Sequence, residues 1–270
     1  MKFNYLIILI LTCSFTSCEN RSQSKKDATP IFKNKGHKLV YEMVQKVGTY
    51  ETLTKKKDVV YSYTYETPDG KTDISTEKYI FAGGLCLGIY HKHERTLPQL
   101  SGEIIQGFDG GHFWLKHNDE YLQDSTMLER VSFNRKTNFY WFTMLPKLLD
   151  SSVNYEYIEE AKIDNKLYDV VKITFNSKKK KPTDIYQLYI NQETSLVDQF
   201  LFTVIDFNVT EKPMLMQMQY EEIEGLSIPS KRQYKTSTWN AEISNDPWIK
   251  VTWSNIKFNN NLSQTEFNKP

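Results

Sequence analysis

Short segments in which apolar or aromatic residues alternate with polar ones recur along most of this chain, with turn residues between them. Residues 59–65 are typical: Val59 and the tyrosines at 61, 63 and 65 lie on one face, because successive strand side chains point to opposite sides. Many short strands joined by short turns predict a mainly β fold, with an antiparallel sheet curled into an incomplete barrel. The further predicted strands are residues 77–81, 87–92, 103–108, 112–116, 155–159, 168–175, 184–190, 197–206, 215–223, 230–236 and 250–258.

Two segments have helical rather than alternating spacing. Residues 36–48 repeat apolar side chains at helical intervals and end at Gly48, and residues 129–150 predict one helix or two short ones broken at Pro146. Consecutive aromatic residues in the second segment cannot share one helix face, because neighbours lie about 100° apart. We therefore expect a lid or plug, with some side chains inside the sheet and others on the first helix or at a cavity mouth. Its members are Phe139, Tyr140, Trp141, Phe142, Leu145 and Leu148.

The N-terminus carries a targeting signal rather than a folded element. Its apolar stretch, residues 5–11, is much shorter than the about 20 residues that span a bilayer. The following Ser14-Phe15-Thr16-Ser17-Cys18 resembles the lipobox of bacterial lipoproteins, and this resemblance implies cleavage before Cys18 and lipidation of that cysteine. An ordinary secretory signal with an incidental cysteine is the alternative.

These features predict the organisation of the whole chain. We expect a signal peptide at residues 1–17, a flexible lipid-anchored tether at 18–35 and a single β domain at 36–270. The protein would be anchored in the bacterial cell envelope, with the outer membrane as the expected membrane and its periplasmic or surface face left open. Cys86 would then be the one unmodified cysteine and, between two leucines, a buried core residue.

Composition and motifs exclude several functions. A net charge of +1 does not favour nucleic-acid binding, and 39% hydrophobic residues argue against disorder. The sequence has no Gly-rich phosphate loop, no Gly-x-Ser-x-Gly elbow and no paired-cysteine motif, so we predict no cofactor and no catalytic site. An enzyme of unknown chemistry remains a weaker hypothesis.

Metal binding is a minor alternative at two places. His91 and His93 are two apart in a predicted strand and would share one face, but a site needs a third ligand that spacing does not supply. Met214, Met216 and Met218 also share a face, where thioethers could bind Cu(I) but more often line a core or cavity. We therefore predict no metal site.

The strand around residues 197–206 is apolar on both faces. Phe200 and Phe202 lie on one face with Leu196, and Val197 and Leu201 lie on the other. A sheet with one face in solvent needs only one apolar face, so this strand has cover on both sides or a cavity on one. A solid core plugged by residues 139–149 and a cavity gated by them both remain open. The residues expected to line a cavity are Met214, Met216, Met218, Phe200, Phe202, Tyr61, Tyr63 and Trp114.

Three hairpin-like stretches and the element order resemble the LolA/LolB-like superfamily and a family of uncharacterised bacterial lipoproteins. The stretches are Phe108-Asp109-Gly110-Gly111-His112-Phe113-Trp114, Leu188-Tyr189-Ile190-Asn191-Gln192-Glu193-Thr194 and Glu224-Gly225-Leu226-Ser227-Ile228-Pro229. The resemblance implies an incomplete antiparallel barrel wrapped on helices around a hydrophobic cavity. No arginine here aligns with the one that controls the lid of LolA-type carriers, so carrier activity is not implied.

Two functions from different classes follow. The first is a lipid-anchored, non-catalytic protein that binds an acyl chain, a lipid or a lipoprotein acyl group in its cavity. The alternative is an envelope interaction module that holds a protein or glycan on exposed aromatic side chains. Candidates for that surface are Tyr61, Tyr63, Tyr65, Trp239, Trp248 and Trp253. The ligand and the oligomeric state stay open.

Overall fold

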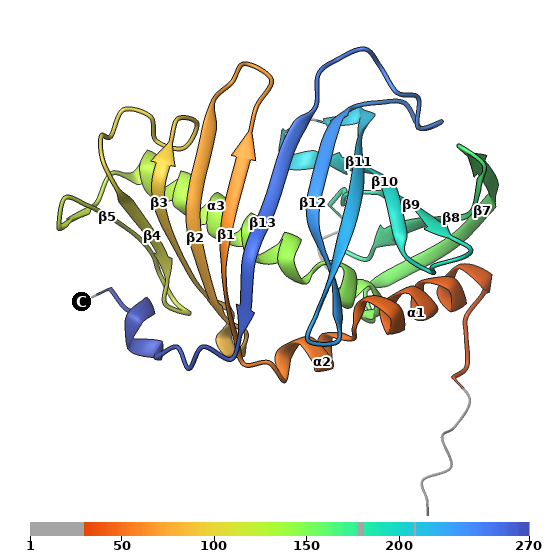
Figure 1. Ribbon diagram of the computed structural model, residues 1–270, viewed down its shortest axis with the longest axis horizontal. Helices are drawn as coiled ribbons and strands as arrows, with labels where there is room; N and C mark the ends of the chain where they lie inside the picture. Colours follow the sequence, from red (N-terminus) through yellow and green to blue (C-terminus); the bar gives the residue numbers. More distant parts are fainter. Residues whose placement is uncertain (1–29, 178–180, 208, 270) are drawn as a thin grey trace, which may run out of the picture. The chain divides into compact units, whose positions relative to one another are not determined.

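Thirteen strands form one antiparallel sheet in the computed structural model, which describes residues 30–177, 181–207 and 209–269 (Figure 1). Their order across the sheet is β6-β5-β4-β3-β2-β1-β13-β12-β11-β10-β9-β8-β7. All neighbours are consecutive in the chain except β1 and β13, whose pairing joins the first strand to the last. The strands are Asp58–Glu66 (β1), Thr72–Ile80 (β2), Leu85–His93 (β3), Ile104–Phe108 (β4), Phe113–His117 (β5), Glu120–Leu122 (β6), Val153–Ile163 (β7), Lys166–Phe175 (β8), Tyr186–Asn191 (β9), Val197–Val204 (β10), Val209–Ile223 (β11), Leu226–Thr236 (β12) and Ile249–Phe258 (β13).

The sheet is open, with β6 and β7 as its two edges. This confirms the predicted fold class, a curled antiparallel sheet that forms an incomplete barrel with helices on its concave side. The predicted strands are all present. The sequence missed β6, which has three residues and therefore too few alternations to show a period.

Two helices lie along the lower ends of the strands in Figure 1. The first, α1 (Lys35–Val47), packs against β7, β8 and β12, and the short α2 (Tyr50–Thr54) follows it. The side chain of Asn34 caps α1 by accepting a hydrogen bond from the His37 N–H. Gly48 ends the helix with a φ of 104°, and a Cβ at this position would lie 2.2 Å from the Leu226 side chain.

The longest helix, α3 (Ser125–Thr143), connects β6 to β7 and packs on β3, β4 and β5. It starts earlier than predicted because Asp124 caps it, accepting a hydrogen bond from the Met127 N–H. The predicted break at Pro146 is confirmed: this proline lies in the first turn of a separate 3₁₀ helix, η2 (Leu145–Leu149). The segment therefore lies against the sheet, as the lid-or-plug hypothesis requires.

A β-bulge corrects one sequence-based expectation. The register of β3 against β2 shifts between Tyr90 and Lys92, which leaves His91 without a partner in the ladder. His91 and His93 consequently do not share a face. The His91 side chain is exposed, whereas His93 is buried with both ring nitrogens within hydrogen-bonding distance of backbone carbonyl oxygens.

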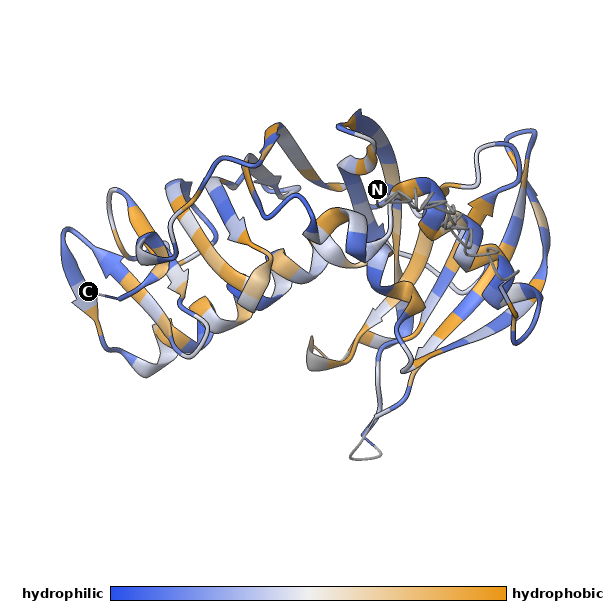
Figure 2. Ribbon diagram, turned by 90° about the horizontal axis from the view of Figure 1, so that it is seen from below, coloured by the Kyte–Doolittle hydropathy of each residue, from blue (hydrophilic) through white to orange (hydrophobic). Residues whose placement is uncertain are grey.

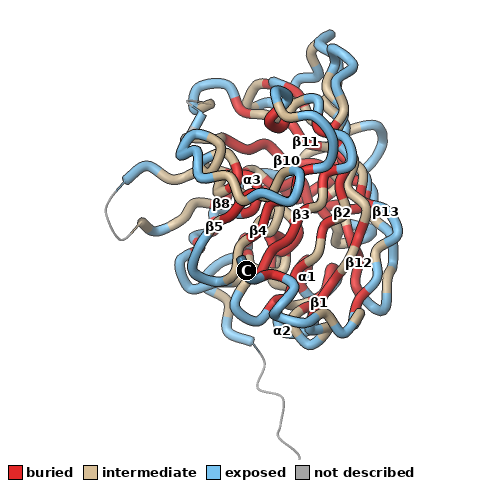
Figure 3. The backbone as a smooth tube through the Cα atoms, turned by 90° about the vertical axis from the view of Figure 1, so that its left-hand side faces the viewer, coloured by how far each residue is buried: buried red, intermediate tan, exposed pale blue. Residues whose placement is uncertain are grey.

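Both faces of the sheet are covered in part. On the convex face, the β12–β13 loop places Trp239 and Trp248 against the outward side chains of β8–β10, including Leu201. The C-terminal segment covers another patch, where Phe267 packs on the Trp114 cluster and accepts the indole N–H at its carbonyl. Figure 2 shows apolar and polar residues alternating along the strands, and Figure 3 shows exposed residues mainly in the loops.

A second bulge moves Val197 to the concave side. The register of β10 against β9 shifts between Val197 and Gln199, so Val197 lies in the same cluster as Phe200 and Phe202 rather than with Leu201. This corrects the expected division of the strand, but both faces are buried, as its apolar character indicated.

The described residues from Phe32 onward form one compact unit. The predicted signal peptide and the lipidation site Cys18 lie outside the described residues. Cys86 is buried, as predicted, and burial raises the pKa of its thiol to about 12. In the described part of the chain, no helix has both the length and the apolar character needed to cross a membrane.

Candidate ligand cavity

A cavity of about 960 Å³ lies on the concave side of the sheet, between α3 and strands that include β1 and β10–β13. This volume is at the upper end of the roughly 300–1,000 Å³ that small-molecule sites have. The cavity exists because the helices fill only part of the concave face. One apolar cluster packs around α1 and η2, another around α2 and the end of α3, and the remaining strand surface is left uncovered.

Aromatic residues form the wall on the β1 and β12–β13 side. Tyr63 and Tyr65 from β1 face it beside Tyr234 from β12 and Trp253 from β13. The hydroxyl groups of Tyr65 and Tyr234 are hydrogen-bonded to each other, so both polar ends are satisfied within the wall. Such residues offer broad apolar surface with a few polar atoms, which suits an amphipathic ligand.

The neighbouring strands β11 and β10 continue the wall with methionine and phenylalanine side chains, and residues of α3 border the cavity as well. Met214 and Met216 from β11 lie beside Phe202 from β10, and their flexible thioether chains suit an irregular apolar surface. Tyr140 and Trp141 border the cavity from α3, with the Trp141 ring packed edge-on against Phe202 at a centroid separation of 5.4 Å.

The cavity-facing arginines differ in how they are satisfied. Arg95 donates from Nη1 to Asp73 Oδ2 at 3.0 Å, and its guanidinium lies 3.7 Å from the Tyr65 ring centroid. Arg232 projects from β12 into the same cavity with only 6% of its surface exposed. Its guanidinium lies 3.8 Å from the Trp253 ring centroid, and burial lowers the pKa of this side chain.

A second buried ion pair lies beside the cavity, under α3. Arg135 donates from both terminal nitrogens to Glu77, at 2.7 and 3.1 Å, and both side chains are fully buried. The hydroxyl groups of Ser75 and Tyr79 also donate to this carboxylate. These contacts fix α3 on the sheet through a polar network and make the helix a firm wall for the cavity.

Four of the eight expected lining residues border the cavity: Tyr63, Phe202, Met214 and Met216. Phe200 and Met218 share their face but are buried in the packed cluster near α1 and η2. Tyr61 also faces inward, where Phe142 stacks on it at 5.1 Å between ring centroids. Trp114 lies apart from these residues, against Phe267.

The expected lid or plug divides into two parts. Tyr140 and Trp141 border the cavity, whereas Phe139 and Phe142 pack in the cluster around Trp253. Leu145 and Leu148 fill the core under α1. The segment is therefore a plug at one end of the concave face and a cavity wall at the other.

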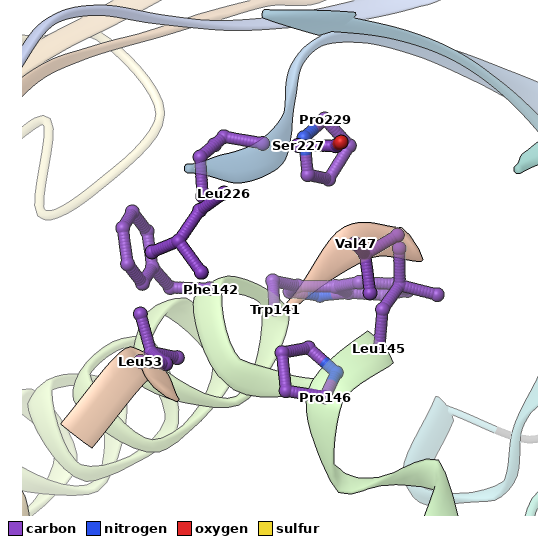
Figure 4. A pocket seen from close by; sticks show the side chains of 10 residues that line it. Val47, Leu53, Trp141, Phe142, Leu145, Pro146, Leu226, Ser227 and Pro229 are labelled. Carbon is purple, nitrogen blue, oxygen red and sulfur yellow. The ribbon is translucent and has the colours of Figure 1, made fainter. Parts of the chain in front are cut away.

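A small crevice marks the end of the plug. It measures about 20 Å³ and lies among Val47, Leu53, Phe142, Pro146 and the start of β12 (Figure 4). That is room for about one water molecule. Trp141 borders both this crevice and the large cavity, so its indole forms a partition between them.

The aromatic platform expected for an interaction module is not formed. Tyr61 and Trp253 are 1% exposed, because the curled sheet turns their face inward. Tyr63 and Tyr65 face the cavity. Trp239 and Trp248 pack partly buried on the convex face. Across the described residues, no group of three or more His, Cys, Asp or Glu side chains is placed to hold a metal ion.

Sequence reasoning missed Arg232 and its neighbour Tyr234 as cavity residues. The signal was their spacing along β12: every second residue shares one face, and that face carries Ile228, Ser230, Arg232 and Tyr234. The sequence therefore already showed an arginine on the same strand face as Ile228 and Tyr234. The fold and the cavity together define this protein as an open, curled antiparallel sheet with a ligand-sized internal space.

No family model matches the chain, and no curated protein does. Among solved structures it is similar to a DUF1329 family protein from Desulfovibrio piger, with 13% identity, a TM-score of 0.48, and coverage of 86% of this chain and 95% of that one. It is also similar to a LolA superfamily protein from Nitrosomonas europaea, with 10% identity, a TM-score of 0.47, and coverage of 87% and 97%. A further similar structure is lipoprotein LppX from Mycobacterium tuberculosis, with 11% identity, a TM-score of 0.29, and coverage of 84% of this chain and 97% of that one.

Proposed function

We propose that this protein is a lipid-anchored component of the bacterial cell envelope that binds an acyl chain or a similar apolar ligand without catalysing a reaction. The observation that carries the proposal is the cavity of about 960 Å³, walled by tyrosine, tryptophan, methionine and phenylalanine side chains. Burying an acyl chain there removes apolar surface from water, at about 0.8 kcal/mol per methylene. Native mass spectrometry of the purified protein tests this directly, since a bound lipid adds a discrete mass that organic solvent removes.

A cavity-filling substitution tests where the ligand binds. Thr137 lies on α3 and borders the cavity, so Thr137→Trp adds an indole to the space that a ligand would occupy. We expect this variant to bind a fluorescent fatty-acid analogue at least about tenfold more weakly, because displacing two methylenes from the cavity already costs that much. Titration of the dye measures the loss.

Thr126→Trp is the matched control, since Thr126 is an exposed residue of the same helix and does not border the cavity. It should bind the dye like the wild type. Equal dye binding by wild type and Thr137→Trp, with both proteins folded, would place the ligand elsewhere and contradict the proposal.

The anchor is tested by changing the proposed lipidation site. Two or three acyl chains hold a protein on a membrane far more firmly than a single chain, which binds only marginally. We expect wild type to partition with membranes and to incorporate labelled palmitate, and Cys18→Ala to be soluble or unprocessed. Wild-type protein that takes up no label and stays in the soluble fraction would remove the anchor from the proposal.

A further inference from the structure

Arg232 is a buried cation without a counter-ion in the described chain. Two other arginines near the cavity each have one: Arg95 pairs with Asp73 and Arg135 with Glu77. Arg130 of α3 also borders the cavity, but it is only half-buried and keeps contact with solvent. No ion pair between described residues includes Arg232, and its Nε atom, which is closed off from solvent, has no hydrogen-bond partner among them. The titratable groups that affect its pKa are phenols of tyrosines such as Tyr61 and Tyr234. Burial raises the pKa values of these phenols, so they are neutral and supply no counter-charge.

Leaving such a group unmatched is costly. An arginine carries five N–H donors in a planar fork and stays protonated at any physiological pH. Burying an ionised group without a partner is strongly unfavourable, and stacking on Trp253 offsets only part of that cost. The guanidinium therefore favours any ligand that brings an anionic oxygen pair into the cavity.

The charges around the cavity agree with this. Four basic and two acidic side chains border it, and one of the acids, Asp73, is already bound to Arg95. The other acid, Asp184, accepts hydrogen bonds from Thr203 and from the Ile205 N–H. The apolar wall of Phe202, Met214 and Met216 belongs to the same cavity as Arg232, so one ligand could contact both.

We propose that the cavity selects anionic amphiphiles, with the carboxylate or phosphate head group held by the Arg232 guanidinium and the hydrocarbon chain against the methionine wall. This inference rests on the proposed function and adds the charge of the ligand to it. The planar guanidinium can donate two parallel hydrogen bonds to the negatively charged oxygens of either head group. An alcohol or an ester carries no negative charge, so its hydrogen bonds with the guanidinium are weaker.

The test compares three probes that share a sixteen-carbon chain: hexadecanoate, hexadecyl phosphate and hexadecanol. Each displaces a fluorescent acyl dye from the full-length protein and from Arg232→Met, Arg232→Lys and Lys136→Met. Wild type should bind one or both anions about tenfold to a hundredfold more tightly than the alcohol, the range expected of hydrogen bonds to a charged group. Arg232→Met should bind anion and alcohol alike, and Arg232→Lys should keep part of the preference.

Lys136→Met is the control for charge at the cavity, because Lys136 is an exposed cation that borders it. The Lys136→Met variant should keep the full preference for anions over the alcohol. The anion that wild type binds more tightly identifies the head group as carboxylate or phosphate. A preference that survives in Arg232→Met, or is lost in Lys136→Met instead, overturns the inference. Equal binding of all three probes by wild type also overturns it while leaving the apolar cavity intact, whereas no binding of any probe refutes the proposed function itself. Melting temperatures identify any variant that does not fold.

Discussion

Replacing Arg135 by methionine is expected to lower the free energy of unfolding by about 3–5 kcal/mol, the cost of removing one partner of a buried ion pair. The guanidinium and the Glu77 carboxylate have 0% side-chain exposure and are joined by two hydrogen bonds. In the variant, Glu77 keeps its hydroxyl donors from Ser75 and Tyr79 but loses its counter-charge. Urea unfolding followed by tryptophan fluorescence measures the loss.

The double variant Arg135→Met/Glu77→Gln is the control, because it removes both charges. It should recover a large part of the stability, since replacing a buried pair as a whole is far less costly than breaking it. Gly88 offers an independent check, because a Cβ at this position would lie 2.3 Å from Arg135 Nη1. The Gly88→Ala substitution should therefore cost more stability when it is made in the wild type than when it is made in the Arg135→Met variant, where the clashing guanidinium is absent. Single and double variants of equal stability would show that the pair does not hold α3 on the sheet.

Met218→Ala should also be strongly destabilising, by about 2–5 kcal/mol, as expected for a large-to-small change in a packed core. Met218 is 7% exposed and lies in the cluster with Phe200, away from the cavity. Met216, the neighbouring inward residue of β11, is 2% exposed but borders the cavity. Met216→Ala should therefore cost less, because it widens an existing space instead of opening a closed void.

The order of the two methionine variants should be reversed for ligand binding: Met218→Ala loses more stability, and Met216→Ala loses more affinity for the ligand. Met216→Ala removes contact surface from the cavity and should weaken uptake of the fluorescent fatty-acid analogue, whereas Met218→Ala should leave it nearly unchanged. Denaturation midpoints and dye titrations of the two proteins measure both effects. A large stability loss in both, with no dye bound by either or by wild type, would indicate a solid core and contradict the ligand-binding proposal.

Much of the fold could be predicted from the sequence, because strand and helix periods are local properties. Alternation placed every strand but β6, and the ring of Pro146 explains the break between α3 and η2. Alternation also grouped Met214, Met216 and Phe202, which do share the cavity wall. Trp114 shows the limit: its strand has two apolar faces, and nothing local indicates which one turns inward.

By itself, the sequence determined where the strands and turns fall, that the sheet is antiparallel and, away from the β-bulges, which residues share a strand face. Tertiary structure decided the rest. The bulge at His91 separates it from His93, and the reach of α1 and η2 decides that Met218 is core while Met216 borders the cavity. Tertiary packing also gives Arg135 a carboxylate and leaves Arg232 with none among the described residues. The physical reason is that a side chain's surroundings are built by strands and helices distant in the chain, and their register and depth of packing leave no trace in the local period of two.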